Sequence, residues 1–151
     1  MSNSTSAKQK YLTTSVDIEI PFHDCDPMNV VWHGNYPRYF EVARCQLLRL
    51  FNYDYPDMVA SGYMWPIVDM RLKYVGSAKF TQLITVSASL VEYEHRIKIN
   101  YVITDKKTGA KLTKGYTVQA AVSVETNELQ LESPPILLEK LQSCLATLRD
   151  K

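Results

Sequence analysis

Apolar and polar side chains alternate near the start of the chain. Residues 14–22, TSVDIEIPF, place β-branched residues at every second position and acidic residues between them. The apolar positions are Val16, Ile18 and Ile20. Because successive side chains of a strand point to opposite faces, this alternation predicts a strand with one buried face.

Apolar residues recur at helical spacing in residues 36–51, YPRYFEVARCQLLRLF. The apolar stripe comprises Tyr36, Phe40, Ala43, Leu47 and Leu50. This spacing predicts a largely buried amphipathic helix. Asn35 suits the N-cap of that helix, and Pro37 suits its first turn.

The second half of the chain favours β-branched and aromatic residues, which are typical of strands. The predicted strands are 64–75, 83–93, 95–105 and 110–124, and DKKTGA forms a hairpin turn between the last two. A terminal helix is predicted from Ser133-Pro134-Pro135 to residue 148. An apolar helix needs a sheet to bury it, so the fold class is α+β with an antiparallel sheet. We expect residues 1–13 to be disordered and residues 14–151 to form a single domain.

Composition and charge narrow the possible partners. The chain has 151 residues, and 17 Lys and Arg against 16 Asp and Glu give a formal charge of +1. Without a basic run, we expect no nucleic acid partner. Three widely spaced cysteines with no CxxC pair argue against a disulfide framework or a thiolate zinc site, and reduced thiols indicate a cytoplasmic protein. We expect no membrane span and no signal peptide.

Chemically capable groups are densest in residues 23–36, HDCDPMNVVWHGNY. Asp26 precedes Pro27, whose ring restricts Asp26 to extended geometry. Val30, Val31 and Trp32 give the same loop an apolar lining. A carboxylate beside apolar surface can act as a general base or as a nucleophile.

His33 and Gly34 come directly before the predicted helix. Backbone N–H groups at a helix start lack an intrahelical acceptor and carry the positive end of the helix dipole. They can therefore stabilise an oxyanion, and Gly34 has no side chain to block close approach. With Asp26, this arrangement would hydrolyse an ester or a thioester. A purely conformational role stays open, because Asp, Asn, His and Gly are common in loops.

Two other chemistries fit the stretch less well. His23, Asp24, Asp26 and His33 could together bind a transition metal. However, His23 and Asp24 are adjacent and leave the strand in different directions, and no HxH or HExxH spacing is present, so we predict no metal. Cys25 lies between two carboxylates, which disfavour the thiolate that a nucleophile needs.

The stretch resembles the motif of hotdog-fold acyl-CoA thioesterases, in particular the 4-hydroxybenzoyl-CoA thioesterase group and the Tol–Pal-associated thioesterases. Those families carry a pattern similar to D-x-D-x-x-G-x-V-x-H/Y-x-N-Y before a long helix, and this chain reads D-C-D-P-M-N-V-V-W-H-G-N-Y. The motif's glycine is Asn29 here. Since Asn tolerates left-handed backbone geometry better than most residues, we expect the turn to survive.

The resemblance implies a hotdog fold, in which an antiparallel five-stranded sheet wraps around a long central helix. It also implies a homodimer or homotetramer with the active site between subunits. Asp26 would be the catalytic carboxylate, and the backbone of His33 would polarise the thioester carbonyl. The substrate would be an acyl-CoA or an acyl-carrier-protein thioester. Coenzyme A would be part of the substrate, with no other cofactor.

Further residues are candidates for binding that substrate. The acyl pocket would be lined by Val31, Trp32, Tyr36, Met64 and Trp65, although Asn35 and Tyr36 also suit a structural role and such apolar residues are often core. The phosphates of coenzyme A would be held by Arg71, Lys73, Lys79 and Arg96, although scattered cations often form a solvated face.

Three alternative functions stay open at this point. The chain could be a thioesterase for acyl carrier protein, which needs a docking surface as well as a pocket. It could be a hotdog dehydratase, which would depend on Glu41 of the helix rather than on Asp26. It could also be a binding module that holds acyl-CoA without cleaving it.

Overall fold

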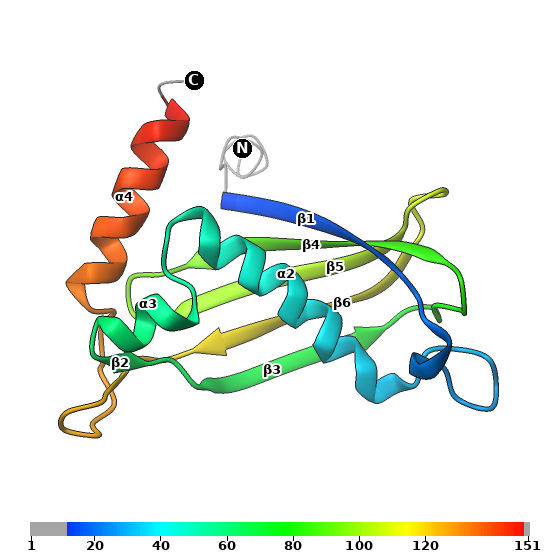
Figure 1. The fold of residues 1–151 in the computed structure, drawn as a ribbon, viewed down its shortest axis with the longest axis horizontal. Coiled ribbons are helices and arrows are strands. Elements are labelled where there is room, and N and C mark those ends of the chain that lie inside the picture. The colour runs from blue at the N-terminus through cyan, green and yellow to red at the C-terminus, as the bar shows by residue number, and fades with distance from the viewer. Residues whose placement is uncertain (1–11, 150–151) are drawn as a thin grey trace, which may run out of the picture.

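The computed structural model describes residues 12–149, in which an antiparallel five-stranded sheet wraps around one long helix (Figure 1). The strands are β1 (Leu12–Glu19), β3 (Ile67–Tyr74), β4 (Leu83–Glu92), β5 (Ile97–Asp105) and β6 (Lys111–Gln119), in the order β1-β4-β5-β6-β3, and the helix is α2 (Tyr36–Leu50). The predicted α+β architecture is confirmed. β1 begins at Leu12 rather than at residue 14, and the disorder predicted for residues 1–13 falls mainly on residues 1–11, outside the described residues.

Shorter elements connect and flank this sheet. They are the 3-10 turns η1 (Phe22–Asp24) and η2 (His33–Asn35), the helices α3 (Tyr55–Ala60) and α4 (Pro135–Arg149), and a two-stranded sheet of β2 (Tyr63–Met64) and β7 (Val122–Ser123). The predicted strand 64–75 is therefore divided. Pro66 lies in the gap between β2 and β3, where it has no N–H to donate to a ladder. The predicted strand 110–124 divides in the same way into β6 and β7.

The core lies between α2 and the face of the sheet that curves around it. The ring of Phe40 stacks on Tyr101 at 4.3 Å between centroids. Gly115 of β6 permits this approach, because a β-carbon there would lie 3.1 Å from the Phe40 ring. Ala43 and Leu47, from the apolar stripe of the sequence, are fully buried. The helical periodicity thus predicted the buried face correctly, except at Leu50, which is exposed at the last turn of α2.

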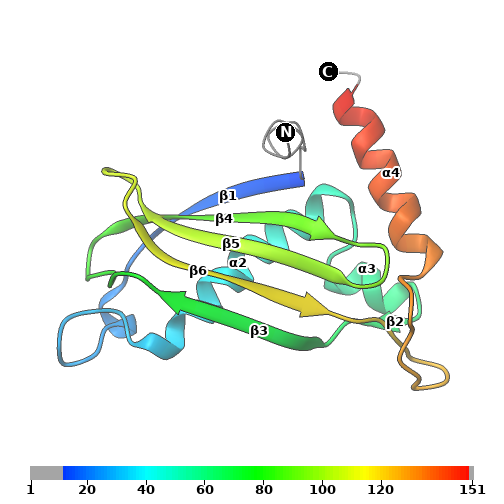
Figure 2. The same ribbon diagram turned by 180° about the vertical axis from the view of Figure 1, so that it is seen from behind.

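The opposite face of the sheet carries no helix (Figure 2). On β1 and β4 this outer face holds small hydroxyl side chains that bond across the strands, Thr13 to Ser89 at 2.9 Å and Ser15 to Ser87 at 3.0 Å. The sheet ends in two edges, β1 and β3. Edge strand β3 exposes several large apolar side chains, namely Ile67, Val68, Met70 and Tyr74. Within residues 12–149, no helix is long and apolar enough to cross a membrane.

Candidate active site

The loop that precedes α2 folds back on itself as a narrow hairpin. The Trp32 amide donates to the Asp24 carbonyl at 3.0 Å, and the Asp26 amide donates to the Val30 carbonyl at 2.9 Å. The loop is also attached to the sheet, because the Val31 amide donates to the Ala78 carbonyl at 2.8 Å. These backbone bonds give residues 24–32 a defined shape.

Asn29 lies at the tip of this hairpin in the left-handed region, with φ of 65°. Its amide donates to the Asp26 carbonyl at 2.9 Å and closes the turn. The expectation that asparagine can replace the motif's glycine here is confirmed.

Asp26 has one occupied and one free carboxylate oxygen. Its Oδ1 accepts a hydrogen bond from the Met28 amide at 2.8 Å, an interaction that orients the side chain within the turn. Its Oδ2 has no hydrogen-bond partner within residues 12–149, and the residue is only partly buried. A carboxylate that is held by one oxygen and open at the other is suited to attack a carbonyl or to take a proton from water.

The helical run begins at His33, because η2 leads directly into α2. The His33 and Gly34 amides therefore lie at the positive end of the helix dipole, where N–H groups lack intrahelical acceptors. Tyr74 of β3 holds this turn in place by donating from its hydroxyl to the His33 carbonyl at 2.8 Å. Gly34 is required for space, since a β-carbon at this position would overlap the indole ring of Trp32.

Asn35 occupies the N-cap position of α2, as predicted, but its side chain makes no capping hydrogen bond. The turn η2 already includes His33 and Gly34, so Asn35 lies within a continuous helical segment formed by η2 and α2. Its side-chain amide instead donates to the Asp24 carbonyl at 2.9 Å. Pro37 does occupy the first turn of α2, as predicted.

Asp24 organises the loop, a role that the sequence did not reveal. Its side chain is buried, with Oδ2 accepting from the Tyr39 hydroxyl at 2.7 Å and Oδ1 from the Arg38 guanidinium at 3.2 Å. Burial, followed by the hydrogen bond to Asp24, raises the pKa of Tyr39. Asp24 thus ties the loop to the first turns of α2. Only the folded helix shows this, because the side-chain partners follow 14 and 15 positions later in the chain.

The metal hypothesis gains no support from this geometry. Among the described residues, no three His, Cys, Asp or Glu side chains gather in a group that could bind an ion. His23 Nε2 lies 3.5 Å from Asp24 Oδ1, and the same carboxylate already accepts hydrogen bonds from Tyr39 and Arg38.

The predicted pocket residues fall into two places. Val31 and Tyr36 are buried beneath the loop, and the Tyr36 hydroxyl accepts from the Ala78 amide at 3.1 Å. Trp32 is half exposed beside His33. Met64 and Trp65 are not brought to this loop, because β2 lies at the opposite end of the sheet (Figure 1).

Trp65 belongs to the core rather than to a surface pocket. Its side chain is 4% exposed, and its indole N–H donates to the Tyr53 hydroxyl at 3.1 Å. Met64 is exposed on β2, opposite Val122 of β7.

The four cations predicted to hold phosphate do not form one group. Lys79 pairs by a backbone bridge with Val30 and so lies beside the loop. Arg96 is engaged with Glu92, at 3.2 Å between Nε and Oε1. Arg71 and Lys73 lie on the edge strand β3 and line a separate cavity.

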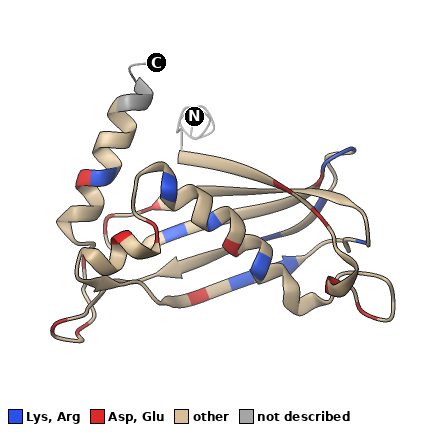
Figure 3. Cartoon of the chain, in the orientation of Figure 1, with Lys and Arg blue, Asp and Glu red and all other residues tan. Residues whose placement is uncertain are grey.

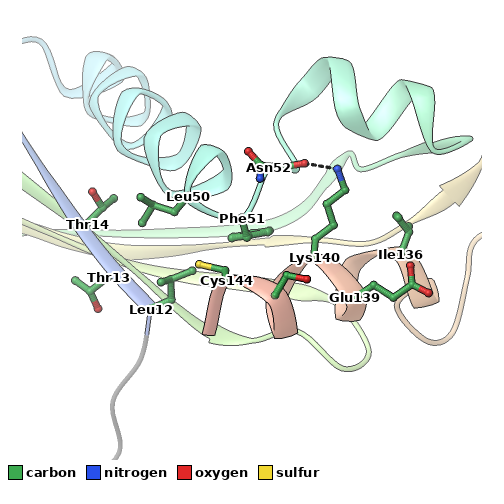
Figure 4. Close-up of a pocket in the computed structure, with 11 residues that line it drawn as sticks. Leu12, Thr13, Thr14, Leu50, Phe51, Asn52, Ile136, Glu139, Lys140 and Cys144 are labelled. Atoms are coloured by element: carbon green, nitrogen blue, oxygen red, sulfur yellow. Dashed lines mark hydrogen bonds between the residues drawn. The ribbon is translucent and has the colours of Figure 1, made fainter. Parts of the chain in front are cut away.

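A larger cavity, of about 830 Å³, lies at the other end of α2 (Figure 4). Its walls come from the start of β1, the C-terminal end of α2 and one side of α4, and they include Leu12, Leu50, Phe51, Ile136 and Cys144. Lys140 crosses one side of it and donates to the Asn52 carbonyl at 2.7 Å. Neither Asp26 nor His33 lines this cavity, so it is distinct from the candidate active site.

Comparison with protein families agrees with the geometry. The model of the thioesterase-like superfamily matches residues 20–141, which include the hairpin loop, α2 and every strand of the five-stranded sheet except β1. The resemblance to the hotdog-fold thioesterases that the motif suggested is thereby confirmed, together with the prediction of a thioester hydrolase.

Individual proteins are similar along much of the chain. A Synechocystis protein named "Putative esterase sll0410" is 26% identical over 125 residues, which are 82% of this chain and 75% of that protein. The Bacillus subtilis protein named "Putative acyl-CoA thioesterase YneP" is 29% identical over 77 residues, which are 51% of this chain and 56% of that protein. The solved structure of the DHNA-CoA thioesterase from Staphylococcus aureus superposes with a TM-score of 0.76 at 25% identity, covering 91% of this chain and 94% of that one.

Proposed function

Because the chain belongs to the thioesterase-like superfamily, we propose that it hydrolyses an acyl-CoA or aroyl-CoA thioester to a free acid and coenzyme A at the Asp26 loop. The observation that carries the proposal is the state of Asp26. One carboxylate oxygen is held by the Met28 amide, the other is free, and the loop is attached both to the sheet and to the start of α2.

Two routes use the same groups. As a nucleophile, the free oxygen of Asp26 attacks the thioester carbonyl, the coenzyme A thiolate leaves, and water then hydrolyses the resulting anhydride. As a base, Asp26 takes a proton from the water that attacks the carbonyl. In both routes the carbonyl oxygen gains negative charge, which the His33 and Gly34 amides stabilise.

A second subunit completes the site in this proposal. The candidate loop is flanked by exposed apolar side chains, among them Trp32, Phe80 and Tyr74, while β3 beside it has an unpaired edge. An exposed apolar edge strand is a template for pairing with another chain. We therefore propose a homodimer in which β3 pairs with its copy and the partner forms the second wall of the acyl pocket. Such dimers could pair further into tetramers.

Other assigned roles follow from position. Lys79, beside the loop, is suited to contact a phosphate of coenzyme A. Glu41, the acid that a dehydratase would need, is engaged with Arg44 one helical turn later on α2. That pairing favours Asp26 over Glu41 as the reactive carboxylate. We expect the enzyme to act in the cytoplasm without a separate cofactor.

Thiol release from a panel of aromatic, short and long acyl-CoAs tests the proposal. Replacing Asp26→Asn should lower the rate at least about 100-fold, since a positioned base or nucleophile contributes that much. Asp17→Asn is the matched control, because Asp17 lies on the outer face of β1, where it pairs with Lys106. An Asp26→Asn enzyme as fast as wild type would overturn the assignment. Turnover of acyl carrier protein thioesters alone would instead identify the carrier as the substrate.

A further inference from the structure

The large cavity at the C-terminal end of α2 takes no part in the proposed reaction. It is lined by Leu12 of β1, Phe51 after α2 and Cys144 of α4, whereas Asp26 and His33 lie outside it (Figure 4). Its volume of about 830 Å³ falls within the range of roughly 300–1,000 Å³ that is typical of small-molecule sites. The cavity therefore has the size of a ligand site and lies away from the candidate active site.

This cavity depends on parts of the chain that the family match does not include. The match covers residues 20–141. The cavity residues Leu12 and Thr14 of β1 precede that range, and Ser143 and Cys144 of α4 follow it. The cavity is therefore a feature that this chain has in addition to the shared thioesterase fold.

The lining between β1 and α4 is largely apolar. Phe51 is 1% exposed and Leu12 is 9% exposed. Ile136 and Cys144 of α4 are partly buried against the same core. Because Ile136, Lys140 and Cys144 follow one another at intervals of four residues, they lie along one face of α4. An apolar chain along this face contacts apolar side chains on both sides of Lys140.

A single cation extends across this apolar lining. The ammonium of Lys140 donates to the Asn52 carbonyl at 2.7 Å and forms no ion pair with a carboxylate of residues 12–149 (Figure 4). Since an ammonium has three N–H donors, two remain for a ligand. Its full positive charge exceeds the charge of about −0.5 at the C-terminal end of α2. The neighbouring acid, Glu139, is exposed and does not pair with Lys140.

We propose that this cavity binds a long-chain monocarboxylate, the chemistry of a fatty acid. The carboxylate pairs with Lys140, and the chain lies against Phe51 and along the apolar face of α4. One carboxylate matches one ammonium, whereas a phosphate group carries about −1.5 to −2 charges and suits several cations. A cationic amphiphile is repelled by Lys140. Binding needs no hydrolysis, so the proposal does not rest on the proposed thioesterase function.

The chain's own N-terminal segment has little apolar surface to offer this cavity. Residues 1–10, MSNSTSAKQK, contain one large apolar side chain, that of Met1. The cavity also lacks the row of apolar side chains without a cation that a second copy of the chain would need. A small amphipathic ligand therefore fits the lining better than either segment of protein.

Calorimetric titration of the whole chain with dodecanoate tests the site. Dodecyltrimethylammonium is the probe with the same chain and the opposite charge, and acetate is the probe without a chain. Dodecanoate should bind at least about tenfold more tightly than either, because only dodecanoate combines an apolar chain with a charge-assisted hydrogen bond.

Variants of two lysines locate the charge that the ligand needs. Lys140→Gln should weaken binding of dodecanoate at least about tenfold, because it keeps an N–H donor but removes the charge. Lys107→Gln is the matched control, since Lys107 is exposed and lies outside the cavity. If dodecanoate binds Lys140→Gln as tightly as wild type, or binds neither protein, the proposal is overturned.

Two thiols report which site the ligand occupies. Cys144 lines the cavity and Cys25 lies beside Asp26, and both are free and partly exposed. At ten times its Kd, dodecanoate leaves about one-tenth of its sites empty. Alkylation of Cys144 by iodoacetamide, followed by mass spectrometry, should therefore slow about tenfold, and that of Cys25 should not.

Two other results of the alkylation experiment contradict the proposal. Protection of Cys25 without Cys144 would place dodecanoate at the Asp26 loop. Slower alkylation of Cys144 at higher protein concentration, without any ligand, would show that a second copy of the chain covers the cavity. Asp26→Asn should lose hydrolysis but protect Cys144 like wild type, so failure of the catalytic proposal and failure of this site give different results.

Discussion

The two ends of α2 differ in the charge that they attract. At the N-terminal end, the His33 and Gly34 amides directly follow the loop that carries Asp26, and this end suits an oxyanion. At the C-terminal end, the Asn52 carbonyl accepts from the ammonium of Lys140, so a cation already occupies the negative end of the dipole. The direction of α2 therefore favours a negatively charged group at its N-terminal end only.

The two ends of α2 also differ in shape, and here the C-terminal end rather than the N-terminal end looks like a binding site. The C-terminal end has the cavity of about 830 Å³, whereas the N-terminal end presents exposed apolar side chains. Cavity size alone would therefore point away from the reactive groups. We interpret the open N-terminal end as half of a site whose other wall is a second subunit.

The largest effect is expected when β3 is prevented from pairing with a second subunit. Met70→Lys places a charge on the exposed, helix-facing side of the edge strand. If the partner completes the site, the variant should be monomeric. Thiol release should then fall about 100-fold, because a substrate that lacks one wall of its pocket is held in the wrong position for reaction.

Analytical ultracentrifugation and the thiol assay measure both effects. Leu131→Lys is the control, because Leu131 is an exposed apolar residue outside β3. A fully active monomer would show that the N-terminal end of α2 needs no partner.

A second test separates the two carboxylates of the loop. Asp24→Asn should lower the free energy of unfolding by about 1.5–3 kcal/mol, because the Tyr39 hydroxyl and the Arg38 guanidinium lose a charged acceptor. Asp26→Asn should leave stability nearly unchanged, since only the Met28 amide binds that side chain. Urea denaturation measures the difference. Equal stability of the two variants would contradict the division into a structural and a reactive aspartate.

Alkaline titration sharpens the same test. Because the pKa of Tyr39 is raised in the folded protein, its contribution to stability is present below the ordinary tyrosine pKa of about 10 and is lost as the pH rises above it. In Asp24→Asn, Tyr39 should ionise at lower pH than in wild type, because one cause of the raised pKa is removed. Near-ultraviolet absorbance of tyrosinate records this, with Tyr39→Phe identifying the signal.

The smallest effect is expected at the C-terminal end of α2. Leu50 lines the large cavity and is 45% exposed, so Leu50→Ala should change the free energy of unfolding by no more than about 0.5 kcal/mol. Thiol release should stay within about twofold of wild type, because the proposed reaction takes place at the other end of the helix. A selective loss with long acyl-CoAs would instead make this cavity part of the acyl site.

Local patterns predicted much of this architecture. The alternation predicted β1 and the helical spacing predicted α2, because the spacing of apolar residues along a short segment reflects which of its side chains are buried. The turn at Asn29 was also predictable, since its left-handed geometry depends on that residue alone. The division of the strand at Pro66 was missed, although the missing N–H of proline was a local signal for it.

Long-range contacts explain what the sequence did not show. Asp24 has the same chemistry as Asp26, and only the packing of α2 against the loop makes one buried and the other open. Met64 and Trp65 were grouped with Trp32 by type, but the course of β3 carries them to the other end of the sheet. Neither result could follow from composition or spacing.

The sequence by itself determined the family and the α+β class, and it pointed to the candidate reactive stretch, because these depend on short-range periodicity and on one compact motif. Only the tertiary structure decided the order of strands, the exposed edge at β3 and the meeting of Lys73 with Lys114. Strand pairing joins residues far apart in the chain, such as Lys73 with Lys114 and Leu12 with Leu90. Such contacts stabilise the protein only after the chain between them has been ordered, so they form when the whole sheet packs around α2.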